Sequence, residues 1–251
     1  TTKVRWDRII DDKSRLKTII SFSNINQQTA GTSRLSKNDY LNDPTLNYTP
    51  ISFRDVKAFR ASTAYERESE SSLFSIIPYI RYNKMDLLPN WTLTFDPQNY
   101  STENKSVGML AKYRHDFKSF NSRAIIGVDL DYSPGSRFEE EIDPTKVGSI
   151  FTSFTTVGTS YDYDAAFYGV SPYIHGEISP LERLHLNTGL RFDYMGYDYD
   201  NNLSVVTTGT HRRPADTTVT FTRVSPKFGA TYDFTKNSNI FFSYNHAFRA
   251  P

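Results

Sequence analysis

Alternation of apolar and polar residues at every second position constrains this chain more than any other feature. In residues 184–194 the even positions carry Leu, Leu, Thr, Leu, Phe and Tyr, and the odd positions carry His, Asn, Gly, Arg and Asp. A period of two predicts a β-strand with one apolar and one polar face. The same reading predicts ten strands, at residues 4–10, 16–24, 55–65, 74–82, 107–113, 124–132, 166–178, 184–194, 228–234 and 240–248.

The connections between these strands alternate in length. Short polar connections are predicted at residues 11–14, 67–72, 118–122, 179–183 and 235–239, and long loops at 26–53, 86–105, 133–162 and 200–218. Strands of about 9 to 11 residues, short turns on one side and long loops on the other are typical of a transmembrane β-barrel. The fold class is therefore all-β, a transmembrane antiparallel barrel, and the whole chain is expected to belong to that one domain.

Composition agrees with this fold and excludes others. Aromatic residues make up 15% of the 251 residues, and tyrosines gather at the long-loop ends of the strands, where an interfacial girdle would lie. The net charge of +1 gives no reason to expect a nucleic-acid partner. Cysteine is absent, which excludes disulfides and thiolate sites. No run of about 20 apolar residues predicts a membrane helix, and residues 1–10 do not resemble a signal peptide.

Three prolines lie inside predicted strands, namely Pro78, Pro172 and Pro226. Proline cannot donate a hydrogen bond to a neighbouring strand, so it usually marks an edge or a bulge. We expect either bulges at these positions or strands shorter than predicted.

Three segments near the C-terminal end follow one another in a distinctive order. They read GLRFDY at residues 189–194, VSPKFGATY at 224–232 and IFFSYNHAFRAP at 240–251. This succession resembles the mid-barrel region of TonB-dependent outer-membrane receptors of the siderophore-receptor kind. The motif match covers residues 184–251, and the earlier residues support it only through the rhythm of their strands.

The resemblance implies a 22-stranded barrel of the bacterial outer membrane, of which this chain would supply about ten strands. The plug domain, the segment that binds the TonB complex and the remaining strands would lie outside this chain. Such receptors actively import scarce nutrients, most often a ferric siderophore, and also haem, cobalamin or glycans. The implied partners are the TonB complex, a ferric siderophore or similar ligand, and outer-membrane lipid with lipopolysaccharide.

Two other functions remain open at this stage. A passive porin shares the alternating strands, and an upstream plug sequence would separate it from an importer. A secreted all-β protein that binds or degrades glycans would also be rich in aromatic residues and loops, but its apolar face would pack against a second sheet.

An enzyme, a metal centre and a cofactor are not expected. The acidic residues at 139–141, at 162 and 164, and at 129 and 131 could be paired catalytic carboxylates, but solvated or ion-paired charge is the better interpretation. The five histidines show no metal-binding spacing.

Ligand contacts are predicted from position alone. Cationic donors in long loops suit an anionic ferric chelate, and aromatic rings suit a flat one. The alternative is that these side chains only face solvent, lipopolysaccharide phosphates or other loops. A second set of charged residues on the polar strand faces is expected to form ion pairs within the wall or with a plug. The loop candidates are Arg137, His211, Arg212, Arg213, Trp91, Phe95 and Tyr100, and the wall candidates are Asp131, Asp193, Lys227 and Arg249.

Overall fold

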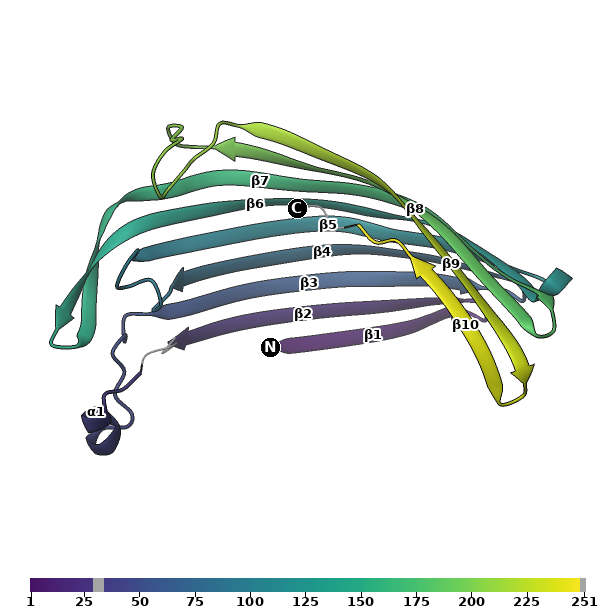
Figure 1. Ribbon diagram of the computed structural model, residues 1–251, viewed down its shortest axis with the longest axis horizontal. Coiled ribbons are helices and arrows are strands. Elements are labelled where there is room, and N and C mark those ends of the chain that lie inside the picture. Colours follow the sequence, from purple (N-terminus) through teal and green to yellow (C-terminus); the bar gives the residue numbers. More distant parts are fainter. Residues whose placement is uncertain (29–33, 249–251) are drawn as a thin grey trace.

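A computed structural model describes residues 1–28 and 34–248. The described chain forms one antiparallel sheet of ten strands in sequence order, so each strand pairs with its neighbours along the chain (Figure 1). All ten predicted strands are confirmed. They are β1 (Thr2–Asp11), β2 (Ser14–Gln28), β3 (Phe53–Glu68), β4 (Ser72–Leu88), β5 (Gln98–Phe117), β6 (Ser122–Val147), β7 (Ile150–Leu181), β8 (Leu184–Asn201), β9 (Thr217–Thr235) and β10 (Ser238–Asn245).

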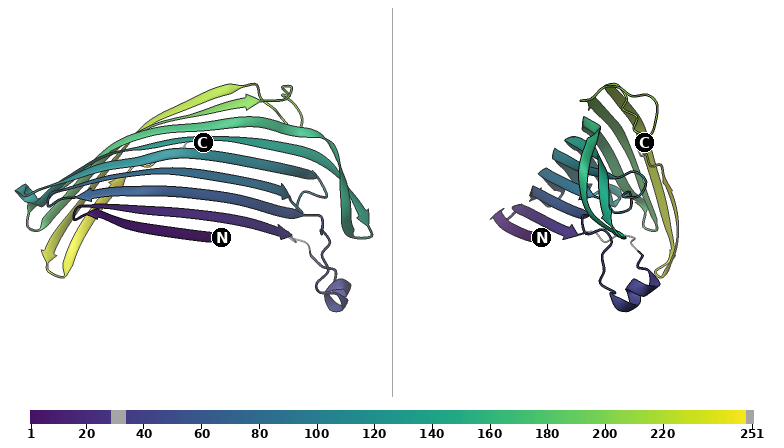
Figure 2. Two further views of the ribbon diagram at one scale, coloured as in Figure 1. Left: turned by 180° about the vertical axis from the view of Figure 1, so that it is seen from behind. Right: turned by 90° about the vertical axis from the view of Figure 1, so that its left-hand side faces the viewer.

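The sheet is strongly curved (Figure 2). A depression of about 510 Å³ lies on its polar face, lined by Asp129 and Asp131 of β6, Tyr79 of β4 and residues 246–248. Tyr79 and residues 246–248 come from opposite halves of the sheet, and they meet across the polar face because that face is concave. We term the polar face inward and the apolar face outward. Among the described residues β1 and β10 pair on one side only, so the sheet is open.

The outward face carries an apolar band with aromatic limits. Phe22, Phe59 and Tyr82 stand opposite one another on β2, β3 and β4 and form its limit toward the long loops. Phe74 and Tyr113 stand opposite each other near the short turns. From Phe74 to Tyr82 the strand advances eight residues, about 26 Å at 3.3 Å per residue. This length matches the apolar band of about 25 Å on barrels that cross an outer membrane.

The three prolines lie within their strands without local bulges. Pro78 pairs in register with Met109, Pro172 with Val128, and Pro226 with Leu190. The register shifts of these ladders fall elsewhere, for example between Ile178 and Leu181. The expectation of bulges or shortened strands at the prolines was therefore wrong. At Pro78 and Ile77 the ladder to β3 lacks two residue pairs, and it resumes in the same register at Tyr65 and Ile76.

The long connections contain more regular structure than the sequence predicts. Residues 133–162, predicted as a loop, continue β6 and β7 as a hairpin that turns between Val147 and Ile150. The connection predicted at 86–105 shortens to residues 89–97, because β4 and β5 both extend beyond the apolar band. The segment 26–53 includes a short helix, α1 (Lys37–Asn42), and the loop predicted at 200–218 shortens to residues 202–216 between β8 and β9. Among the described residues, no helix is long and apolar enough to cross a membrane.

Candidate functional site

The long-loop end of the sheet holds the apolar core of the described chain. Leu88, Leu93, Ile142 and Phe151 are buried against one another, and they come from β4, the connection after it, β6 and β7. Backbone hydrogen bonds reinforce this packing. The Phe151 N–H donates to the Tyr48 carbonyl at 2.9 Å, and the Ile142 N–H donates to the Pro97 carbonyl at 3.0 Å. The connection before β3, the β4–β5 connection and the β6–β7 hairpin therefore form one packed unit.

Arg137 and Tyr100, two of the predicted ligand contacts, lie together on the inward side of this unit. The Arg137 guanidinium lies 4.4 Å from the centre of the Tyr100 ring, and its Nε donates to Glu139 Oε2 at 2.8 Å. Glu139 is only 1% exposed, and it stands directly opposite Tyr100 on the neighbouring strand. Burial raises the pKa of the Tyr100 hydroxyl above its ordinary value.

His211 joins the β8–β9 loop to the β4–β5 connection. Its Nε2 lies 3.2 Å from Asp96 Oδ1, and its ring packs edge-on against Tyr161 with centroids 5.5 Å apart. Next to Asp96, Phe95 is 74% exposed, and Trp91 in the same connection is 50% exposed. The structure thus brings His211, a predicted ligand contact, to the β4–β5 connection, which carries the predicted contacts Trp91 and Phe95.

The two neighbouring arginines of the β8–β9 loop differ in their surroundings. Arg213 donates to three backbone carbonyls, those of Ser204, Thr159 and Ser160, at 3.0 to 3.3 Å. Arg212 is exposed and makes one longer contact, from its Nε to the Gly209 carbonyl at 3.4 Å. Arg213 therefore ties the loop to β7, whereas Arg212 presents its charge to solvent.

Two ion-paired clusters line the inward face of the wall. The Arg81 guanidinium lies 2.6 Å from Asp131, which also accepts hydrogen bonds from Tyr79 and Ser133. Arg191 lies between Asp129 and Asp193, at 2.6 and 2.7 Å. The expectation of ion pairs within the wall is confirmed for Asp131 and Asp193.

The other two wall candidates are Lys227 and Arg249. Lys227 crosses Gly189, where an added Cβ would stand 2.4 Å from the lysine Cε. Arg249 lies outside the described residues. The arginine partners Arg81 and Arg191 were missed, although both occupy polar positions of predicted strands, which is the signal that could have found them.

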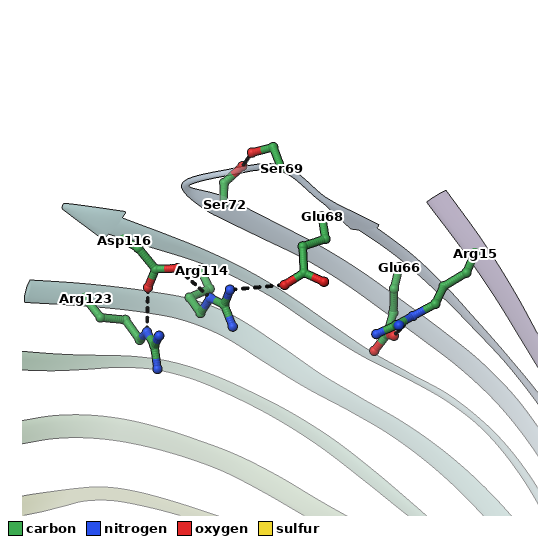
Figure 3. Close-up of polar contacts among 8 residues, drawn as sticks. All are labelled: Arg15, Glu66, Glu68, Ser69, Ser72, Arg114, Asp116 and Arg123. Atoms are coloured by element: carbon green, nitrogen blue, oxygen red, sulfur yellow. Dashed lines mark hydrogen bonds and ion pairs between the residues drawn. The ribbon is translucent and has the colours of Figure 1, made fainter. Parts of the chain in front are cut away.

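A third set of ion pairs lies at the short-turn end (Figure 3). Arg15 of β2 lies 2.8 Å from Glu66 of β3. Arg114 of β5 bridges Glu68 and Asp116, at 3.4 and 3.1 Å, and Asp116 in turn lies 2.5 Å from Arg123 of β6. Arg15–Glu66 and Asp116–Arg123 join neighbouring strands, whereas Arg114–Glu68 links β5 to β3 across β4. Each exposed pair stabilises the sheet only modestly.

No cluster of three or more acidic or histidine side chains that could hold a metal occurs in the described part of the chain. Glu139, one of the carboxylates considered above, is neutralised by Arg137.

Comparison with known proteins identifies the class to which this fold belongs. The family model of the TonB dependent receptor-like β-barrel matches residues 5–251, so the chain belongs to that family. This family consists of outer-membrane transporters and receptors, not enzymes. A search of curated proteins finds no match.

Three solved structures show the same fold. The ferric citrate transporter FecA in its unliganded form has a TM-score of 0.71 at 16% identity, over 95% of this chain and 34% of that one. The ferric yersiniabactin uptake receptor FyuA of Yersinia pestis has a TM-score of 0.69 at 9% identity, over 95% and 36%. The copper transporter OprC has a TM-score of 0.67 at 13% identity, over 99% and 36%. The chain thus spans about a third of these structures and corresponds to part of a larger barrel.

Proposed function

We propose that the complete protein imports an iron complex, in particular a ferric siderophore, across the bacterial outer membrane with energy supplied through the TonB complex. The observation that carries this proposal is the packed loop unit at one end of the inward face. It holds Arg137 against Tyr100 on the inward side, and Trp91 and Phe95 are exposed in its β4–β5 connection. A passive pore needs no such built rim, and membership of the receptor family supports active import.

The surroundings of the predicted contacts suggest different roles for them. Arg212 is the cation best placed to meet an anionic ligand first, because its guanidinium is exposed. Arg213 and His211 position the β8–β9 loop through their contacts with Ser160 and Asp96. Arg137 and Tyr100 would receive the ligand deeper, since both are half-buried on the inward side.

The proposed partners beyond the ligand follow from the membrane setting. The outward apolar band would contact outer-membrane lipid, and the polar strand ends above it would contact lipopolysaccharide. The TonB complex would act through segments outside this chain. No second sheet covers the apolar face within residues 1–28 and 34–248, which argues against a secreted glycan-binding protein.

Uptake by cells tests the proposal. A strain lacking the gene and a strain lacking TonB receive radiolabelled iron as ferric citrate, a ferric catecholate or a ferric hydroxamate, with copper as a separate probe. We expect loss of uptake of at least one iron complex in both strains, restored by the full-length gene only where TonB is present. Uptake that survives without TonB would identify a passive pore, and loss confined to copper would contradict the iron assignment.

A further inference from the structure

The pairing of β3 with β4 places two arginines directly opposite each other on the inward face. Arg60 stands opposite Arg81, and the register continues across β2 and β1 through Ser21 to Lys3. Three cationic residues thus lie at one level of the wall, and we term Lys3, Arg60 and Arg81 the cationic row. Like charges directly opposite each other destabilise a sheet. An arrangement of this kind is therefore expected to have a compensating partner.

Among residues 1–28 and 34–248, Arg81 is the only member of the row that has such a partner. Asp131 binds Arg81, and the Arg81 guanidinium also lies 4.9 Å from the centre of the Tyr79 ring. Neither Arg60 nor Lys3 forms an ion pair in the described part of the chain, and both are exposed. Asp131 binds Arg81, Tyr79 and Ser133, and in the described part of the chain it forms no ion pair with Arg60.

The inward positions around Arg60 offer no other carboxylate. From the level of the row toward the long loops, the inward residues of the four strands are neutral or basic. Apart from the row itself they are Ser21, Ser23, Ile25 and Gln27 on β2, Ala58, Val56 and Arg54 on β3, and Asn83, Met85 and Leu87 on β4. The upper half of this wall is therefore positively charged on its inward side.

The cationic row lies on the same inward face as the packed loop unit formed by the connection before β3, the β4–β5 connection and the β6–β7 hairpin. Arg81 directly precedes Tyr82, which belongs to the aromatic limit of the apolar band toward the long loops. On the same inward face, Arg54 lies six residues beyond Arg60, about 20 Å. Arg54 stands opposite Leu87, which stands opposite Tyr100, the residue on which Arg137 stacks. Inward cations thus lie at both ends of this stretch, Arg54 beside the loop unit and Arg60 in the row, with neutral inward residues between them.

We propose that the cationic row binds the carboxylate groups of an anionic ferric chelate after its capture by the loops. Guanidinium groups bind carboxylates through paired, charge-assisted hydrogen bonds, and two facing arginines can hold a ligand with more than one carboxylate. This inference rests on the proposed import of an iron complex and specifies its chemistry: the ligand carries net negative charge. The row is the second contact of the ligand, below Arg137.

Binding to the purified full-length protein tests the row directly. The probes are ferric citrate, which is anionic, and a ferric trihydroxamate without negative charge. The variants are Arg60→Gln and the double variant Arg60→Gln/Arg81→Gln. The matched control is Lys57→Gln, because Lys57 is an exposed cation of the same strand that faces outward. Heat-dependent migration on gels verifies that each variant is folded.

We expect Arg60→Gln to weaken ferric citrate binding about tenfold and the double variant to weaken it further, since one charged hydrogen bond accounts for about a tenfold change in Kd. Lys57→Gln and trihydroxamate binding should not change. The proposed role of the row is wrong if both variants bind ferric citrate as the wild type does, or if the wild type does not bind ferric citrate. Equally weakened binding of both probes would also contradict the proposal, and would indicate that the row contacts the plug domain instead. Binding that follows the prediction without any TonB-dependent uptake refutes the import proposal alone.

Discussion

Tyr79 performs three tasks at one point of the wall. Its ring covers Gly108, where an added Cβ would stand 2.3 Å from the tyrosine Cζ and 2.5 Å from the Leu130 carbonyl oxygen. Its hydroxyl donates to Asp131, and its ring lies under Arg81. Glycine is required at 108 because the ring occupies the space that a side chain would fill, a pairing of aromatic residue and glycine that also pins strand register.

Replacement of Gly108 by alanine should therefore destabilise the barrel. We expect a loss of about 1–3 kcal/mol of unfolding free energy, the usual cost of overpacking. Gly176→Ala is the matched control, since its nearest neighbours would stand at 3.9 Å. Urea unfolding of the full-length protein in lipid vesicles measures both variants. Equal effects of the two substitutions would show that the contact with Tyr79 is not the cause.

Single residues also show what the sequence could and could not predict about the site. Arg137 and Glu139 are two positions apart and face the same side of β6, so their ion pair follows once the segment is known to be a strand. Placing 133–162 in a loop concealed it. The contact of His211 with Asp96 joins residues 115 apart in sequence, and only the folded loops bring them together. The pattern of a single chain carries no signal for such a pair.

At the scale of elements, strand existence was predictable and strand length was not. Within the apolar band one face must be apolar, which produces the clear alternation. Beyond the band both faces of a hairpin meet water or polar loops, so the alternation fades, as in the Glu139–Glu141 run. β6 and β7 extend there through cross-strand pairs and through the buried Ile142 and Phe151.

The segment around α1 depends on one carboxylate. Asp39 accepts hydrogen bonds from the Tyr48 hydroxyl and from Ser36 Oγ, the latter at 2.7 Å. These bonds, with that of Tyr48 the larger influence, lower the pKa of Asp39 below its ordinary value of 3.8. A lowered pKa stabilises the folded segment above the ordinary value, and this stabilisation is lost as the pH falls through the folded-state pKa.

We therefore expect faster amide exchange in residues 34–52 below about pH 4, after correction for intrinsic rates. Asp39→Asn should give this faster exchange already at neutral pH and remove the acid dependence. Hydrogen exchange with mass spectrometry measures the segment. Asp43→Asn serves as the control, because among the described residues the Asp43 side chain accepts a hydrogen bond from Thr45 alone and the substitution keeps the backbone bonds of Asp43. Identical protection in wild type and Asp39→Asn would contradict the role of this carboxylate.

At the scale of the whole molecule, the edge strands β1 and β10 must be paired with further strands, because the outward apolar band places the sheet in lipid. Backbone groups of an edge strand cannot remain unpaired in lipid, so a working barrel needs strands on both sides of this sheet. The match to about a third of larger receptors agrees with that requirement. Alternate residues of each strand then face lipid, and a charged side chain at those positions should destabilise the barrel more than one on the inward face.

Two adjacent isoleucines of β4 test this assignment of faces. Ile76 faces outward, in register with Ala111 and Tyr65, whereas Ile77 faces inward, in register with Leu110. Because arginine on the lipid-facing side must leave water, Ile76→Arg should cost about 1–3 kcal/mol of unfolding free energy at this depth. Ile77→Arg should cost less, since the inward face already holds Asp129 and Arg191 in ion pairs. Urea unfolding of both full-length variants in lipid vesicles gives the comparison, and a larger loss for Ile77→Arg would reverse the two faces of the sheet.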